Sequence, residues 1–200
     1  MSKIILDLCG GTGAWSKPYK DAGYDVRVIT LPEHDVFEYY DYQYFIKDVH
    51  GILAAPTCTM FSLARTTAKT PRDLEGGYKL VDRCLEIVRD CRINGNLKFW
   101  ALENPVGYLR QLLGKPPLTF DPCDYGATYT KKTDLWGYYN FPAKKKRELT
   151  EEEKARCAIN NRELPQLPLD YRLPEYFKAQ QARRSMTDEH FAKAFFKANR

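Results

Sequence analysis

The chain contains few of the residues from which metal sites and disulfide frameworks are built. Its 200 residues include 6 cysteines and 3 histidines, and no two cysteines form a Cys-x-x-Cys pair. Structural zinc sites and disulfide-rich scaffolds depend on paired cysteines or clustered histidines. The sequence therefore predicts neither a bound metal nor a disulfide framework.

Long hydrophobic runs are also absent. The uncharged apolar segments are far shorter than the roughly 20 residues of a membrane-spanning helix. Met1-Ser2-Lys3 leads directly into a strand-like segment rather than a signal peptide. Because 44% of the 200 residues are apolar, the chain can bury one sizeable core. We expect a single domain in the cytoplasm, without a membrane partner.

Positive charge is confined to one part of the chain. The formal net charge is +5, and all of the excess lies in residues 141–200. Lys144, Lys145 and Lys146 form the main basic cluster there, followed later by Arg183-Arg184. Such clusters suit a nucleic-acid backbone, although most basic runs are solvated surface. Charge alone leaves both interpretations open.

Apolar periodicity predicts alternating strands and helices. Pro71 is expected in the first turn of one helix, and Thr187 is expected to cap the last one. The expected strands are 3–8, 25–30, a segment ending at 55 and 97–102; the expected helices are 15–22, one from about 71, 106–113 and one from about 188. This order predicts an α/β fold.

Three expected strands end in residues that can carry chemistry. Cys9-Gly10-Gly11-Thr12-Gly13 follows the first strand, Cys58 follows the run from Ile52 to Ala55, and Glu103-Asn104-Pro105 follows the run from Leu97 to Leu102. The carboxyl ends of parallel strands meet at one edge of a sheet, where ligands bind. We therefore expect a glycine loop, a nucleophilic thiol and an acid to face one crevice.

Each of these elements also has an ordinary structural interpretation. The glycines can form a tight turn, a lone cysteine is more often a small buried hydrophobe, and Glu103 can cap a following helix. Ser16 stands where a dinucleotide-binding loop has its third glycine, which disfavours a nicotinamide cofactor. S-adenosylmethionine has no pyrophosphate, so its binding does not require that third glycine.

In combination, the motifs resemble the DNA (cytosine-5) methyltransferase family. The matching segments, in the order of the family, are Asp7-Leu8-Cys9-Gly10-Gly11-Thr12-Gly13, Pro56-Thr57-Cys58-x-x-Phe61-Ser62 and Glu103-Asn104-Pro105. Softer matches are Asp35-Val36, Tyr125-Gly126 with Lys131 to Trp136, and Arg184 to Thr187 with the closing helix. The chain departs from the pattern at Pro56, which precedes Cys58 by two residues, at Thr59 and at Thr30.

The resemblance implies a Rossmann-like methyltransferase fold, with a mostly parallel sheet and helices on both faces. Residues 1–200 would form one catalytic domain, with 137–172 as a reduced target-recognition region and 185–200 as the closing helix, similar to compact members from phages. The implied cofactor is S-adenosylmethionine, held by residues Asp7, Cys9, Gly10, Gly11, Thr12, Gly13, Trp15, Asp35, Val36 and Pro56.

The resemblance also implies roles in catalysis and DNA binding. Cys58 would add to carbon 6 of cytosine, Glu103 would act at ring nitrogen 3, Asn104 would hold the turn, and Lys131 or Lys132 would contact the target base. DNA would be contacted by Ser62, Arg65, Lys144, Lys145 and Lys146, with the loop from Thr59 to Thr70 closing the gap left by a flipped base. An RNA (tRNA) cytosine-5 methyltransferase and a catalytically silent nucleic-acid-binding module remain alternatives.

Overall fold

The computed structural model describes residues 3–63, 65, 69–158, 164–175 and 177–200. These residues form a six-stranded sheet in the order β2-β1-β3-β4-β6-β5. The strands are β1 (Ile4–Leu8), β2 (Asp25–Ile29), β3 (Val49–Ala54), β4 (Phe99–Pro105), β5 (Leu118–Phe120) and β6 (Thr133–Tyr138). β1 to β4 are parallel, whereas β6 runs antiparallel to both β4 and β5. The predicted α/β fold with a mostly parallel sheet is confirmed.

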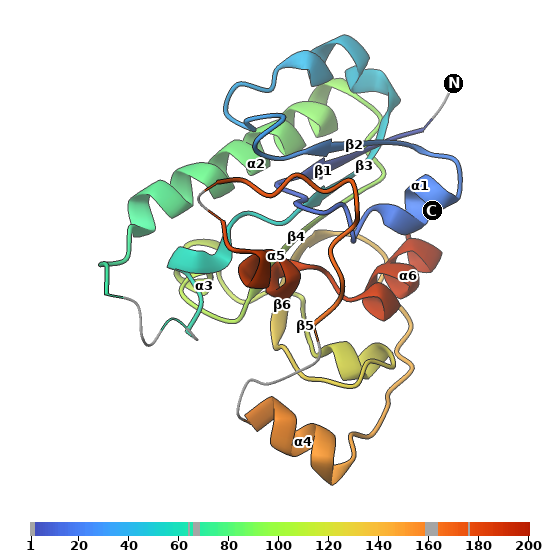
Figure 1. Ribbon diagram of the computed structural model, residues 1–200. Helices are drawn as coiled ribbons and strands as arrows, with labels where there is room; N and C mark the ends of the chain where they lie inside the picture. Colours follow the sequence, from blue (N-terminus) through green and yellow to red (C-terminus); the bar gives the residue numbers. More distant parts are fainter. Residues whose placement is uncertain (1–2, 64, 66–68, 159–163, 176) are drawn as a thin grey trace.

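Helices cover both faces of this sheet, as expected. Alternate residues of β1 enter two cores: Ile4, Leu6 and Leu8 on one face, and Ile5 on the other. α2 (Leu74–Asn94) covers the first face, whereas α1 (Lys17–Asp21) and α6 (Glu189–Ala198) lie side by side on the second (Figure 1).

The remaining helices are short and lie between the strands or after the last strand. They are the 3-10 helices η1 (Asp41–Asp48), η2 (Cys58–Met60) and η3 (Pro122–Tyr125), and the α-helices α3 (Leu109–Leu113), α4 (Glu151–Ala158) and α5 (Ala179–Ser185). Within the described ranges, no helix combines the length and apolar character needed to cross a membrane.

Two helices begin three residues later than expected, each because of a local hydrogen bond. The helix expected from Pro71 begins at Leu74, because the Asp73 carboxylate accepts a hydrogen bond from the Gly76 amide. The helix expected at 106–113 begins at Leu109, because the Val106 amide donates to the Lys132 carbonyl.

Two further observations concern the helices that cover the second face of the sheet. α1 begins at Lys17, within a few residues of the expected start at about 15. The cap of the last helix is Asp188 rather than Thr187, since the Asp188 carboxylate accepts from the amides of His190 and Phe191.

Candidate functional site

The candidate site lies where the strand order reverses. β1 is flanked by β2 on one side and β3 on the other, and the crevice outside the carboxyl ends at such a point is the usual ligand site of open α/β sheets. The Cys9 amide donates to the Ile29 carbonyl at 2.8 Å, and the Ala55 amide donates to the Leu8 carbonyl at 2.9 Å. The glycine loop and the segment leading to Cys58 therefore leave the sheet side by side.

The backbone of the glycine loop is tightly wound. The Gly13 amide donates to the Gly10 carbonyl at 2.9 Å, and Cys9, Gly11 and Gly13 have φ values of 56°, 55° and 69°. A Cβ at Gly10 would overlap the Asp7 carboxylate, whereas a Cβ at Gly11 would meet no atom within 4 Å. The loop thus has a packed inner side and an open outer side, which a ligand can approach along the backbone.

The Asp7 carboxylate packs against the inner side of this loop at Gly10. The Asp7 side chain is fully buried, and its Oδ2 accepts a hydrogen bond from the Ser16 hydroxyl at 2.5 Å. Within the described residues, Oδ1 has no hydrogen-bond partner. Burial, partly opposed by the Ser16 hydrogen bond, raises the pKa of Asp7 from 3.8 to about 7. Asp7 connects the loop to the start of α1.

Two other predicted cofactor residues lie in different places: Cys9 begins the glycine loop, and Val36 lies in the core. Contact with Cys84 and burial raise the pKa of Cys9, and the charges of Asp7 and Asp35 raise it further. Val36 is buried in the core beneath α2.

Trp15 requires a correction. Its indole is 2% exposed and packs on Phe191 and Phe195, with ring centroids 6.0 and 5.4 Å away. The family resemblance implies a cofactor contact for Trp15. The structure instead assigns Trp15 to the contact between the loop and α6.

Arg83 is a residue of this region that the sequence analysis missed. Its buried guanidinium donates to the carbonyls of Val36 and Tyr39 at 3.1 and 2.9 Å, and it pairs with Glu86 at 2.7 Å. It therefore fixes the segment that follows Asp35. An arginine beside the apolar residues Val81 and Cys84 of α2 is the sequence signal that could have indicated it.

A thiol, a carboxylate and an ammonium group meet at the ends of three elements. Cys58 is the first residue of η2, Glu103 lies near the end of β4, and Lys131 precedes β6. Lys131 Nζ lies 3.6 Å from Glu103 Oε1, and both side chains are largely buried, with exposed fractions of 22% and 11%. Burial raises the pKa of Cys58, the Lys131 charge opposes this rise, and the Glu103 charge adds to it.

Asn104 joins two of these elements. Its side chain is fully buried, and its Nδ2 donates to the Pro56 carbonyl at 2.9 Å. The end of β4 is thereby tied to the backbone two residues before Cys58. Lys132, the alternative to Lys131, is exposed at the surface. Of the two lysines, Lys131 pairs with Glu103 and its charge acts on the Cys58 thiol.

The predicted DNA contacts lie around this cluster and farther away. The Ser62 amide donates to the Cys58 carbonyl at 2.9 Å, so Ser62 lies in the same turn as the thiol. Arg65 Nη2 donates to the carbonyl and hydroxyl of Thr70 at 2.9 and 2.7 Å. Residues 64 and 66–68 of the expected closing loop lie outside the described residues, as do 159–163 of the expected recognition region.

The basic cluster is partly neutralised. Lys144 Nζ pairs with Asp124 Oδ2 at 2.9 Å, and Arg147 pairs with Glu153 at 2.9 Å. Lys145 and Lys146 are exposed, and neither forms an ion pair with another described residue. Lys145 and Lys146 thus carry the free charge of the cluster.

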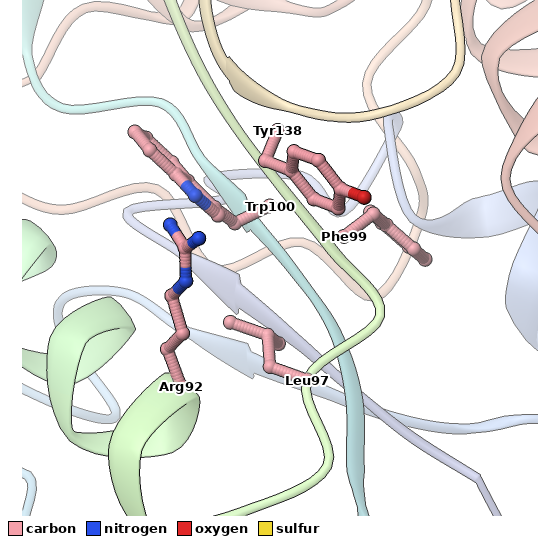
Figure 2. Close-up of a pocket in the computed structure, with 5 residues that line it drawn as sticks. All are labelled: Arg92, Leu97, Phe99, Trp100 and Tyr138. Carbon is pink, nitrogen blue, oxygen red and sulfur yellow. The ribbon is translucent and has the colours of Figure 1, made fainter.

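A cavity of about 210 Å³ lies at the other end of β4. Figure 2 shows its lining: Arg92, Leu97, Phe99, Trp100 and Tyr138. None of these described residues was predicted for the site, and Trp100 precedes Glu103 by three positions along the strand. The cavity is separate from the thiol cluster.

Comparisons with known proteins add little. No family model and no curated protein matches the chain. Among solved structures, the Entamoeba histolytica methyltransferase EhMeth is similar with a TM-score of 0.40 and 11% identity, over 76% of this chain. The match spans only 57% of that structure. Because the TM-score is so low, the function must be argued from the site itself.

Proposed function

We propose that this chain methylates carbon 5 of cytosine in DNA through a covalent adduct with Cys58. The observation that carries the proposal is the Lys131–Glu103 ion pair at the carboxyl edge of the sheet, whose two charges both act on the Cys58 thiol. This cluster lies beside the strand-order reversal at which the glycine loop leaves β1. A Rossmann-like methyltransferase fold is part of the same proposal.

The glycine loop fits S-adenosylmethionine as the methyl donor. Its open side at Gly11 allows close backbone approach, and the Asp35 charge acts on Cys9 at the start of the loop. We assign the backbone from Cys9 to Gly13, with Asp35 and Pro56, to cofactor binding. When bound, S-adenosylmethionine supplies an electrophilic methyl group.

The protein's own groups activate the base. Carbon 5 of cytosine becomes nucleophilic only after a nucleophile adds at carbon 6, and the Cys58 thiolate makes that bond. The addition places negative charge on ring nitrogen 3, which Glu103 stabilises by sharing a proton. The Lys131 charge favours the thiolate and pairs with Glu103. Once carbon 5 carries the methyl group, a base removes its proton, the double bond between carbons 5 and 6 re-forms, and Cys58 leaves as the thiolate.

The test is the identity of the methylated product. Incubation with S-adenosylmethionine and duplex DNA should yield 5-methylcytosine, detected by mass spectrometry of the digested DNA. Cys58→Ala should yield none. 4-Methylcytosine as the product, or unchanged yield with Cys58→Ala, contradicts the proposal. If 5-methylcytosine forms in tRNA but not in DNA, the substrate is RNA.

A calorimetric measurement with S-adenosylhomocysteine separates binding from chemistry. Gly11→Val should weaken binding, since a branched side chain is strained at φ +55° and blocks backbone approach. Glu103→Gln should bind nearly as tightly as wild type while turnover falls. Equal loss of affinity in both variants contradicts this assignment of roles.

A further inference from the structure

Arg72, just before α2, holds the backbone of the turn that carries Cys58. Its Nη1 donates to the Met60 carbonyl at 2.8 Å, and its Nη2 donates to the Ser62 carbonyl at 2.9 Å. The same guanidinium lies over the Tyr108 ring, 4.8 Å from its centroid. One side chain thus contacts the carbonyls two and four residues after Cys58, and also the Tyr108 ring, which follows β4.

The turn is also held by other contacts, since Phe61 is fully buried and stacks on Tyr78, and the Asp73 amide donates to the Met60 sulfur at 3.3 Å. Within it, the amides of Phe61 and Ser62 both donate to the Cys58 carbonyl, at 3.0 and 2.9 Å. On its far side, the Tyr108 amide donates to the Phe61 carbonyl at 2.9 Å, and Ser62 forms a β-bridge with Gly107. Arg72 adds the hydrogen bonds to the carbonyls of Met60 and Ser62. Without it, the carbonyls of Met60 and Ser62 lose these donors.

Arginine suits this position for physical reasons. Its planar guanidinium presents several donors in a fixed arrangement and keeps its charge throughout the accessible pH range. Hydrogen bonds from a charged donor are roughly twice as strong as neutral ones. A lysine can make one such contact but cannot serve two carbonyls while stacking on Tyr108.

We infer that Arg72 is a positioning residue that holds the Cys58 thiol in the geometry required for attack on its substrate. The inference rests on the proposed function for the identity of the substrate, which is cytosine. The hydrogen bonds to the turn stand independently of that function. Losing them should release the turn, which exposes Cys58 to solvent and displaces it from the attacking position.

The test compares Arg72→Met and Arg72→Lys with Arg89→Met as a matched control. Arg89 lies on α2, its side chain is 63% exposed, and its carboxylate contacts are 3.6 Å or longer. With DNA containing 5-fluorocytosine, the adduct should form on the order of 10- to 100-fold more slowly in Arg72→Met, since two charge-assisted hydrogen bonds are lost. Arg72→Lys should recover part of the rate, and Arg89→Met should match wild type.

A second readout needs no nucleic acid. The rate at which N-ethylmaleimide alkylates each cysteine is measured by peptide mass spectrometry. Alkylation of Cys58 should rise severalfold in Arg72→Met, opposite to the fall in adduct formation. Cys84 and Cys91 are fully buried in the core, so their alkylation reports unfolding and should stay at the wild-type rate.

Three outcomes overturn the inference. The first is adduct formation in Arg72→Met at the wild-type rate. The second is unchanged alkylation of Cys58, and the third is faster alkylation of Cys84 and Cys91 alongside Cys58, which shows general unfolding. Absence of an adduct in wild type refutes the proposed function, and the alkylation rates then decide whether Arg72 holds the turn.

Discussion

At the scale of single residues, burial and the Lys131 charge have opposite effects on the pKa of Cys58. Burial favours the neutral thiol, whereas the reaction needs the thiolate. Lys131 is the positive charge that opposes this effect, and it also pairs with Glu103. The pH at which Cys58 becomes reactive therefore depends on Lys131.

Lys131→Met should move the pH dependence of Cys58 alkylation to higher pH. The substitution removes the charge that lowers the pKa of the thiol, while burial and Glu103 continue to raise it. The measurement is the iodoacetamide rate as a function of pH. The adjacent, exposed Lys132→Met is the control and should leave the profile unchanged. A downward shift, or equal shifts in both variants, contradicts the assignment of Lys131.

Asp7 should make the free energy of unfolding depend on pH. Between its ordinary pKa of 3.8 and its folded value of about 7, the unfolded chain is ionised at Asp7 while the folded protein keeps the proton. Wild-type stability should therefore fall as pH rises through this window, by roughly 4 kcal/mol, and level off above it. Asp7→Asn cannot titrate, so urea unfolding at several pH values should lack this fall. Parallel pH curves for the two proteins would contradict it.

At the scale of secondary-structure elements, the sequence predicted what depends on local pattern. The strand at 3–8 follows from a run of apolar residues that ends before Gly10, and its end correctly indicated the edge of the sheet where the loop lies. β6 was missed because it contains Asp134, which is fully buried and pairs with Arg110, 24 residues away, at 2.6 Å. The packing of Trp15 on Phe191 and Phe195 could not be predicted, because these partners are distant in sequence.

The cap of α6 gives a test at this scale. Asp188→Ala should lower the free energy of unfolding by about 1 kcal/mol, because the amides of His190 and Phe191 lose their acceptor. Thr187→Ala should change it by less than about 0.5 kcal/mol. Chemical denaturation of the two variants decides. A larger loss from Thr187→Ala would show that the cap is misassigned.

At the scale of the whole molecule, the distribution of positive charge leads to a prediction about how the protein recognises DNA. The excess charge lies after residue 140, where few residues are available to read base edges. We therefore expect contact chiefly with phosphates and a short target sequence. Because Lys144 is already paired with Asp124, Lys145 and Lys146 should carry most of this contact.

The double substitution Lys145→Ala and Lys146→Ala should flatten the salt dependence of DNA binding. Each lysine that contacts a duplex phosphate contributes about 0.9 log unit of affinity per log unit of salt. Lys144→Ala should change the slope less. Fluorescence anisotropy at several salt concentrations measures all three proteins. An unchanged slope in the double variant, or altered sequence preference, would show that these lysines do not serve as phosphate contacts.

The most direct test of the central claim is to map the covalent adduct. DNA containing 5-fluorocytosine should trap the wild-type protein in the presence of S-adenosylmethionine, because fluorine at carbon 5 cannot leave as a proton. We predict that peptide mass spectrometry places the base on Cys58 and that Cys58→Ala forms no adduct. An adduct on another cysteine, or no adduct from an enzyme that methylates cytosine, would contradict the assignment of Cys58 as the nucleophile.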